Sequence, residues 1–334
     1  MKIFNLLLAF LIQAPLFSQI MISNVSEIEK VRNGTTYIAM QNPDAPEAQA
    51  FIEVYKKYWT ISEMQFISYD EVEKHLSPEA SFFTLGGYEE YFQTGGFDAT
   101  KPIQSMRTAT KTYVYLELWT CKDSFFKVLT AKEKRKKARK KKRSKIREIK
   151  FDEIDKHQIA RIELFVDAPT LHQPDSIYNS EYDGGGHIRN WGPGFLKNYL
   201  QLLMQLLEQE KVRGLYQRAL KKDKLGKLRN QPLYIPDYVL IRFGMFTTDE
   251  SGRRNKEELL SQYPFGGRFL PTDELDQKLL QNEEEFYYLV YVKLSSDKIV
   301  SIMNSRTGEL IYSNFAGLSY NIKSKDFKLI AKSL

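Results

Sequence analysis

The sequence contains one cysteine, Cys121, and only four histidines. A single cysteine excludes an intramolecular disulfide, and its position far from the N-terminus excludes a lipid-anchored cysteine directly after a leader peptide. No two histidines stand at the i, i+4 spacing of a helical zinc pair, and Gly-x-Ser-x-Gly, P-loop and dinucleotide-binding patterns are absent. We therefore expect no cofactor, and we expect Cys121 to be a small, buried or half-buried apolar residue.

Long hydrophobic runs are scarce as well. After the positive charge of Lys2, an apolar stretch covers residues 3–12 and is interrupted only by Asn5. This is the layout of a secretory signal peptide, and it is well short of the roughly 20 residues that span a bilayer as a helix. We expect residues 1–18 to be cleaved, the mature chain to begin at Gln19, and the protein to be periplasmic or secreted without a transmembrane segment. A cytoplasmic N-terminal helix is the alternative.

What the chain does contain is the composition of a folded protein, with 42% hydrophobic and 13% aromatic residues, over a length that suggests about two domains. Two segments, 66–83 and 269–288, share a pattern in which Asp70-Glu71 aligns with Asp273-Glu274, and later leucine and aromatic positions also match. The segments upstream of each correspond in the same order. We infer a duplicated unit.

Each unit is expected to contain a strand, a helix, a strand, a second helix and then further strands. Ser68 and Thr272 are expected to cap the second helices, with Glu71 and Glu274 in the first turns, where acidic side chains favour the positive end of the helix dipole. Capping explains the repeated Asp-Glu pairs better than acid/base chemistry does. The expected strands are 36–40, 64–67, 113–119, 159–166, 233–243 and 268–270, and the expected helices are 48–58 and 256–263.

The predicted fold class is α/β, or α+β, with two pseudo-repeated βαβα-plus-meander units at 19–227 and 228–334. The second unit ends in an antiparallel meander, because its alternating strands are broken at 295–297 and 304–308. A long amphipathic helix over 194–222 is expected to connect the units, with Asn190 as its cap and Pro193 in its first turn. Its expected apolar face consists of Leu196, Tyr199, Leu200, Leu203, Leu206 and Leu207.

The order of elements in each unit is similar to that of small βαβα domains in exported bacterial envelope proteins. The leader end "LFSQ" and the stretch "NWGPGFLKNYLQ" resemble uncharacterised secreted proteins of the Bacteroidetes. This resemblance covers the two repeats and the helix between them, and it brings no catalytic motif. It implies an extracytoplasmic location.

A basic block at 132–150 lies inside an insertion at 121–157, between two expected strands. It holds thirteen Lys or Arg and two Glu, a net charge of +11, whereas the whole chain carries +7. The basic charge is therefore local, and the block, which has no Gly or Pro, is expected to be helical when it is docked or bound. In free solution its like charges oppose the helix, and its N-terminal half is expected to be disordered. The residues expected to bind an anionic surface are Lys134, Arg135, Lys136, Lys137, Arg139, Lys140, Lys141, Lys142 and Arg143.

The glycine-rich stretch 182–195 is the best candidate for a ligand loop. Glycines before a helix let backbone N–H groups approach an anion, although a structural strand-to-helix loop explains the stretch better. Its candidate residues are Asp183, His187, Arg189 and Trp191, and a metal set of His172, Asp175, Asp183 and His187 is the less favoured alternative. A second candidate is the segment 86–97, where Tyr88 and Tyr91 stand between glycine pairs as in a ligand-stacking loop or at a sheet edge.

These observations favour a non-catalytic binding or scaffold protein of the cell envelope. Its basic insertion would contact an anionic envelope surface or an acidic protein partner. Nucleic acid is disfavoured, because the block lacks the aromatic residues on which bases stack and a leader directs the chain out of the cytoplasm. The alternative is a hydrolytic or metal-assisted enzyme that uses the loop at 172–191. A merely solvated basic arm is the plainest interpretation of the block.

Overall fold

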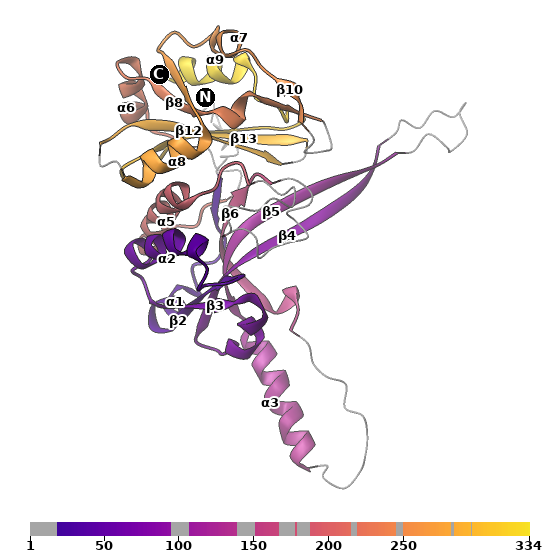
Figure 1. Cartoon of the computed structure of the whole chain (residues 1–334). Helices are drawn as coiled ribbons and strands as arrows, with labels where there is room; N and C mark the ends of the chain where they lie inside the picture. Colours follow the sequence, from indigo (N-terminus) through magenta and orange to yellow (C-terminus); the bar gives the residue numbers. More distant parts are fainter. Residues whose placement is uncertain are drawn as a thin grey trace, which may run out of the picture.

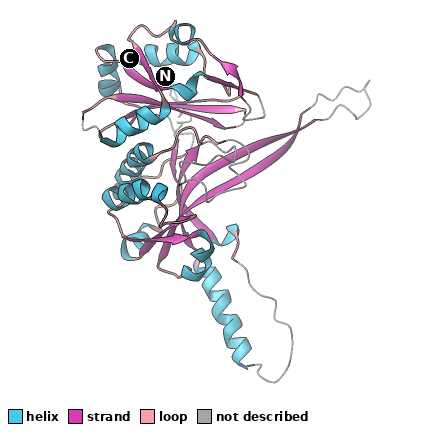
Figure 2. Ribbon diagram, viewed as in Figure 1, coloured by secondary structure: helices cyan, strands magenta, loops and turns pink. Residues whose placement is uncertain are grey.

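The computed structural model describes residues 19–94, 107–138, 151–166, 178, 188–214, 219–244, 250–281, 284–294 and 296–334. These residues form two six-stranded mixed sheets with helices around and between them (Figures 1 and 2). The predicted class, α/β or α+β, is confirmed. Among the described residues, no helix has the length and apolar character needed to cross a membrane.

The first sheet is built from the N-terminal half of the chain. Its strands are β1 (Ile20–Ile22), β2 (Thr35–Met40), β3 (Glu63–Ser68), β4 (Ala80–Thr94), β5 (Arg107–Cys121) and β6 (Lys156–Leu164). The strand order is β1-β6-β5-β4-β2-β3. Strand β2 is parallel to β3 and β4, and all other pairs are antiparallel. The helical segments are α1 (Ile28–Asn33), α2 (Pro46–Tyr58), the 3-10 helix η1 (Tyr69–His75), α3 (Asp123–Ala138), η3 (Glu153–Asp155) and α5 (Pro193–Glu208).

The second sheet is built from the C-terminal half. Its strands are β7 (Ala219–Leu220), β8 (Leu233–Pro236), β11 (Gly267–Leu270), β12 (Tyr287–Leu294), β13 (Asp297–Asn304) and β14 (Leu310–Ala316). The strand order is β11-β8-β12-β13-β14-β7. The helical segments are α6 (Lys222–Leu225), η5 (Gly226–Arg229), η6 (Asp237–Leu240), α7 (Lys256–Leu260), α8 (Thr272–Gln281) and α9 (Ser324–Ser333). Strands β9 (Ile241–Phe243) and β10 (Glu250–Arg253) form a separate pair.

The two sheets share one topology. Strand β8 is parallel to β11 and β12, and the remaining pairs, including β7 with β14, are antiparallel, as in the first sheet. Glu71 and Glu274 both lie in the first turn of the helix that follows the second parallel strand, as expected. The correspondence also extends to the helix after each meander, α5 in the first unit and α9 in the second. The second sheet begins with β7, somewhat before residue 228.

Helix α5 joins the two units. It packs against α2 of the first unit and α8 of the second, and all six residues of its expected apolar face are buried. The helix is shorter than expected, because it ends at Glu208 rather than near residue 222. The chain turns at Glu210, which has a positive φ of 48°, and Arg213 then forms an antiparallel bridge with Ile22.

Three other expectations need correction. The strand expected over 233–243 is broken by η6, because Pro236 has no N–H to continue the ladder and the chain leaves the sheet there. Ser68 does cap η1, but α8 starts at Thr272 itself, whose N–H and hydroxyl both donate to Asp237. The segment expected as a loop from residue 86 belongs as far as Thr94 to β4, which pairs with β5 along a long hairpin (Figure 1).

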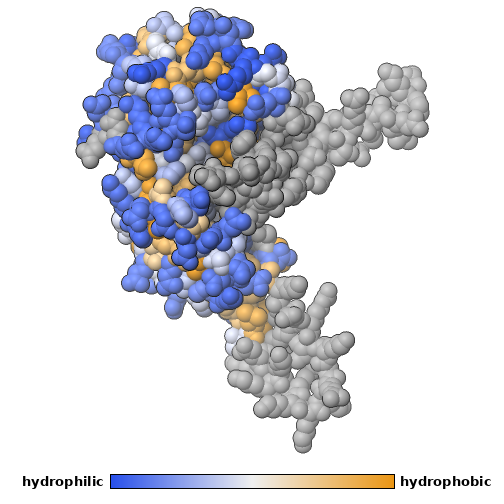
Figure 3. Space-filling view, viewed as in Figure 1, coloured by the Kyte–Doolittle hydropathy of each residue, from blue (hydrophilic) through white to orange (hydrophobic). Residues whose placement is uncertain are grey.

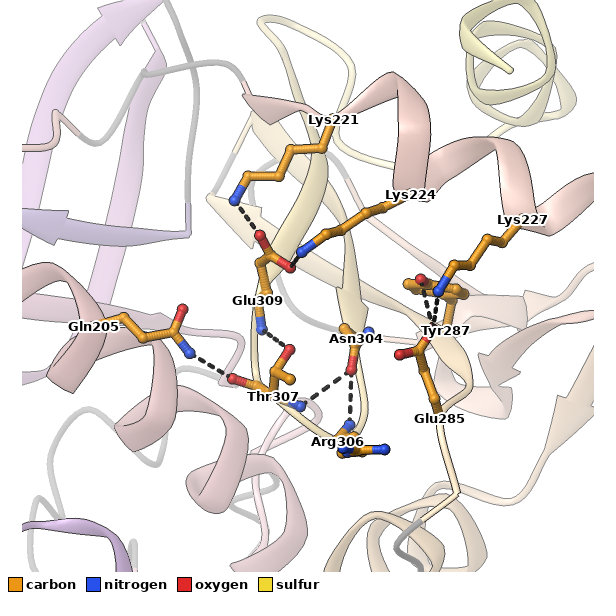
Figure 4. Close-up of polar contacts among 10 residues, drawn as sticks. All are labelled: Gln205, Lys221, Lys224, Lys227, Glu285, Tyr287, Asn304, Arg306, Thr307 and Glu309. Atoms are coloured by element: carbon orange, nitrogen blue, oxygen red, sulfur yellow. Dashed lines mark hydrogen bonds and ion pairs between the residues drawn. The ribbon is translucent and has the colours of Figure 1, made fainter.

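The meander is confirmed as β12, β13 and β14. The turn between β13 and β14 contacts α5, where the side chains of Gln201 and Gln205 donate to the carbonyl oxygens of Arg306 and Thr307 at 3.0 and 2.8 Å. Figure 4 shows this turn, which is stabilised from within because Asn304 accepts from the N–H groups of the same two residues. The turn therefore fixes the second sheet against the helix that follows the first.

Candidate functional site

The basic insertion begins as α3, which projects away from the body between β5 and β6 (Figure 1). Its first turn is anchored. Phe125 is buried, and its ring packs edge-on against Phe151, which itself stacks on Trp119 at 5.3 Å between ring centroids. The carboxylate of Asp123 binds Lys30 of α1 at 2.8 Å, and this ion pair lowers the pKa of Asp123. The insertion is thus fixed at its base by the first sheet.

Beyond this base, α3 leaves the core. Val128 is 54% exposed, and Phe126 and Leu129 are half-buried. In Figure 3 the visible face of the body is mostly hydrophilic, and hydrophobic side chains gather where α3 emerges. A helix that combines exposed apolar residues with Lys and Arg has the composition of an interfacial helix.

The predicted anion-binding residues continue along this helix. The backbone of Lys134, Arg135, Lys136 and Lys137 lies in α3, so the start of the block, which was expected to be disordered in free solution, is helical as far as Ala138. The remaining predicted residues, Arg139, Lys140, Lys141, Lys142 and Arg143, lie outside the described residues.

The first part of the glycine-rich stretch, with Asp183 and His187, lies outside the described residues, as do His172 and Asp175. Its end shows what the glycines do. Asp276 of α8 accepts a hydrogen bond from the N–H of Phe195 at 2.9 Å, and its carboxylate lies only 2.4 Å from the position that a Cβ of Gly192 would occupy. The anion at this helix start is therefore a side chain of the same chain. Burial raises the pKa of Asp276 to about 6, although the N–H groups that it binds lower it.

The other described residues of this stretch contact the body. Trp191 is 9% exposed and stacks on Phe51 at 5.8 Å, and Arg189 forms an ion pair with Glu250 at 2.8 Å. Asn190 is not the expected cap. Its side chain accepts from the N–H of Phe165 and donates to the carbonyl oxygen of Glu163, so it joins β6 to the start of α5.

The second candidate loop also has a defined structure. Tyr88 is 40% exposed on β4, and its ring stacks on Tyr113 of β5 at 4.7 Å. Tyr91 belongs to the same strand, opposite Thr110. The two tyrosines therefore lie along a hairpin rather than in a loop.

One polar cluster was not anticipated from the sequence. On β6, the fully buried Glu163 accepts a hydrogen bond from Arg161, whose guanidinium lies 4.3 Å from the centre of the Tyr115 ring. On the adjacent β5, the buried Glu117 binds Lys156 at 2.7 Å and Gln158 at 2.9 Å. Burial raises the pKa of Glu163 to about 7, while Arg161 lowers it. Polar residues at alternating positions of two adjacent strands were the available signal.

Cations of the second unit are partly neutralised within the chain. Lys221 and Lys224 both bind Glu309, and Lys227 binds Glu285 at 2.6 Å (Figure 4). Glu309 consequently has a lowered pKa, because these hydrogen bonds outweigh the effect of its burial. These lysines serve the packing of α6 and η5 against the meander.

Among the described residues, no group of three or more His, Cys, Asp or Glu side chains could hold a metal ion. Cys121 is buried, as expected, and burial raises the pKa of its thiol to about 12. No protein-family model, no curated protein and no solved structure matches the chain.

Proposed function

We propose that this chain is an exported, non-catalytic binding protein of the cell envelope, attached peripherally to an anionic membrane surface through its basic insertion. The observation that carries the proposal is the form of α3. It is a helix anchored at its base by Phe125 and Asp123, it projects from the body (Figure 1), and its last seven residues, 132–138, begin a block of net charge +11. The backbone of the first part of this block therefore lies on a helix that projects from the rest of the chain, whose net charge is negative.

The number of basic residues in the block favours an anionic membrane surface as the ligand. Each Lys or Arg near an anionic membrane contributes about 1 kcal/mol, so even half of the thirteen basic residues would hold the protein there. The exposed Val128 adds apolar contact of the kind that interfacial helices use. For an exported bacterial protein, phospholipid headgroups and lipopolysaccharide phosphates supply this charge.

Location is part of the proposal. The leader layout at 1–18 supports export, and mass spectrometry of the native protein would test it. A mature chain that starts near Gln19 in an extracytoplasmic fraction is the expected result. Retention of Met1 in a cytosolic fraction would contradict it.

Matched charge removal tests the surface contact. Lys134, Lys136 and Lys137 are replaced by Gln in one variant, and the exposed lysines Lys325, Lys328 and Lys332 of α9 in the other, so that both variants lose the same charge. Affinity for vesicles that contain anionic lipid is measured by sedimentation. At about 1 kcal/mol per residue, the α3 variant should bind about 100-fold more weakly, and the α9 variant should bind nearly as the wild type does.

Two further measurements test whether the basic block binds the vesicles. Deletion of residues 132–143 should abolish vesicle binding and leave the unfolding midpoint nearly unchanged, because these residues contain no large apolar side chain. Binding should also weaken steeply as salt is raised. Equal loss in the two triple variants would show that general charge, not α3, is responsible. Capture of an acidic protein without vesicle binding would replace the membrane by a protein partner.

A further inference from the structure

A small pocket lies in the second unit where α7 and α9 begin. It has a volume of about 230 Å³, and its lining consists of Arg254, Asn255, Glu258, Leu259, Lys323 and Ser324. Pockets for drug-sized ligands span about 300–1,000 Å³. This pocket is therefore of a size suited to one small polar group.

Arg254 is the notable residue of this pocket. Its position is fixed, because its backbone N–H donates to Leu240 at 2.8 Å and the next residue, Asn255, caps α7. Its side-chain Nε is buried and has no hydrogen-bond partner among the described residues. A buried nitrogen without a hydrogen-bond partner is costly, and partial burial of the half-exposed Arg254 side chain lowers its pKa. Because Arg254 lines the pocket, a ligand with negative charge would stabilise its guanidinium cation.

The surroundings favour an anion over a cation. Lys323 adds a second positive charge to the lining, and Arg242 lies close enough to Arg254 to disfavour its charged form. Glu258 is the acidic residue of the lining and partly offsets them. Asp326, on the first turn of α9, is already bound to the buried Lys298 at 2.5 Å.

We propose that this pocket binds a small oxyanion, a phosphate or a phosphomonoester group, through Arg254 and Lys323. Ser324 and Asn255 supply further hydrogen-bond donors from the same lining. Arg presents a planar set of donors that fits two phosphate oxygens, and Lys adds a point charge. Glu258 limits the affinity, because it adds a negative charge to the lining.

This site is independent of the membrane contact. Figure 1 shows α7 and α9 at one end of the molecule and α3 at the other. The pocket, which is lined by residues at the start of these two helices, therefore lies far from α3. A phosphate group bound there therefore belongs to a soluble ligand or to an anionic surface other than the one that α3 contacts.

Isothermal titration of the full mature chain with inorganic phosphate tests the proposal, in a buffer without other oxyanions. Saturable binding of one phosphate is expected, and Arg254→Gln and Lys323→Gln should each weaken it at least about tenfold, the loss of one charge-assisted contact. Glu258→Gln should tighten binding. Lys328→Gln, an exposed change on the outer side of α9, is the matched control and should leave the affinity unchanged.

A second measurement uses the wild-type protein alone, so its result does not depend on whether the variants fold. In the wild-type protein, phosphate should shift the backbone amide resonances of Asn255 and Ser324, while those of α3 remain in place. The proposal is overturned if no saturable binding occurs, or if Lys328→Gln weakens binding as much as Arg254→Gln. Neutralising the α3 lysines should leave phosphate binding intact, so the two sites can fail separately.

Discussion

Gly194 stands where the two units meet, and its replacement by Ala measures how closely they are packed. A Cβ at this position would lie 2.0 Å from the carbonyl oxygen of Asp276 and 2.9 Å from the Cβ of Leu279. Both are atoms of α8 that cannot swing aside as the end of a long side chain would. Overpacking of this kind costs about 1–3 kcal/mol, and contact with backbone places it at the upper end. The gain in helix propensity returns up to about 1 kcal/mol, which leaves a net loss of about 2 kcal/mol.

Gly226→Ala provides the matched control, because nothing lies within 4 Å of its added Cβ and its φ of −56° suits any residue. This change should be neutral or stabilise by up to about 1 kcal/mol. Urea unfolding followed by tryptophan fluorescence measures both variants. If Gly194→Ala unfolds within about 0.5 kcal/mol of the wild type, the close approach of α5 to α8 is wrong.

Three further predictions concern buried ionisable groups. The pKa of Asp276 is raised from 3.8 to about 6, so its contribution to stability is present below pH 4 and is lost as the pH rises through 6. Asp276→Asn should remove this loss, which is at most about 3 kcal/mol and is reduced by the partial exposure of the residue, as urea unfolding at pH 4 and pH 8 would measure. Lys298→Ala should destabilise the fold by about 3–5 kcal/mol, because it leaves Asp326 buried without its partner, and a second change, Asp326→Asn, should restore part of the loss in the same assay. Cys121 should resist a thiol reagent at pH 8 until the protein is unfolded, since burial raises its pKa to about 12, and rapid labelling of the folded protein would contradict this.

The meander and the parallel strands could be predicted because their information is local. Alternating apolar residues bounded by Asn, Asp and Gly indicate a strand and its end, and β13 and β14 follow this rule. The break of the strand after Pro236 was missed. Pro236 itself was the signal, because a proline has no N–H to continue the ladder and interrupts a strand pattern.

The residues of the candidate site also divide into those that the sequence predicts and those that depend on distant contacts. The basic block is visible from composition alone, but the helix that α3 forms over its first residues, as far as Ala138, was expected only in a bound state. The role of the glycines before α5 was not predictable, because Phe195 and Asp276 are separated by 81 positions. The pair of Arg161 and Glu163 was missed for a related reason, since what buries a polar residue on a strand is decided by tertiary packing.

The most direct test of the membrane contact is a measurement of which part of the chain meets the lipid. A fluorophore is attached to Ala131→Cys on the exposed side of α3, and in a second variant to Leu318→Cys, which is 88% exposed in the second unit. The buried Cys121 should remain unlabelled. On anionic vesicles that carry a headgroup quencher, the label on α3 should be quenched and the label at residue 318 should not. Equal quenching of the two labels, or quenching at residue 318 alone, would contradict attachment through the basic insertion.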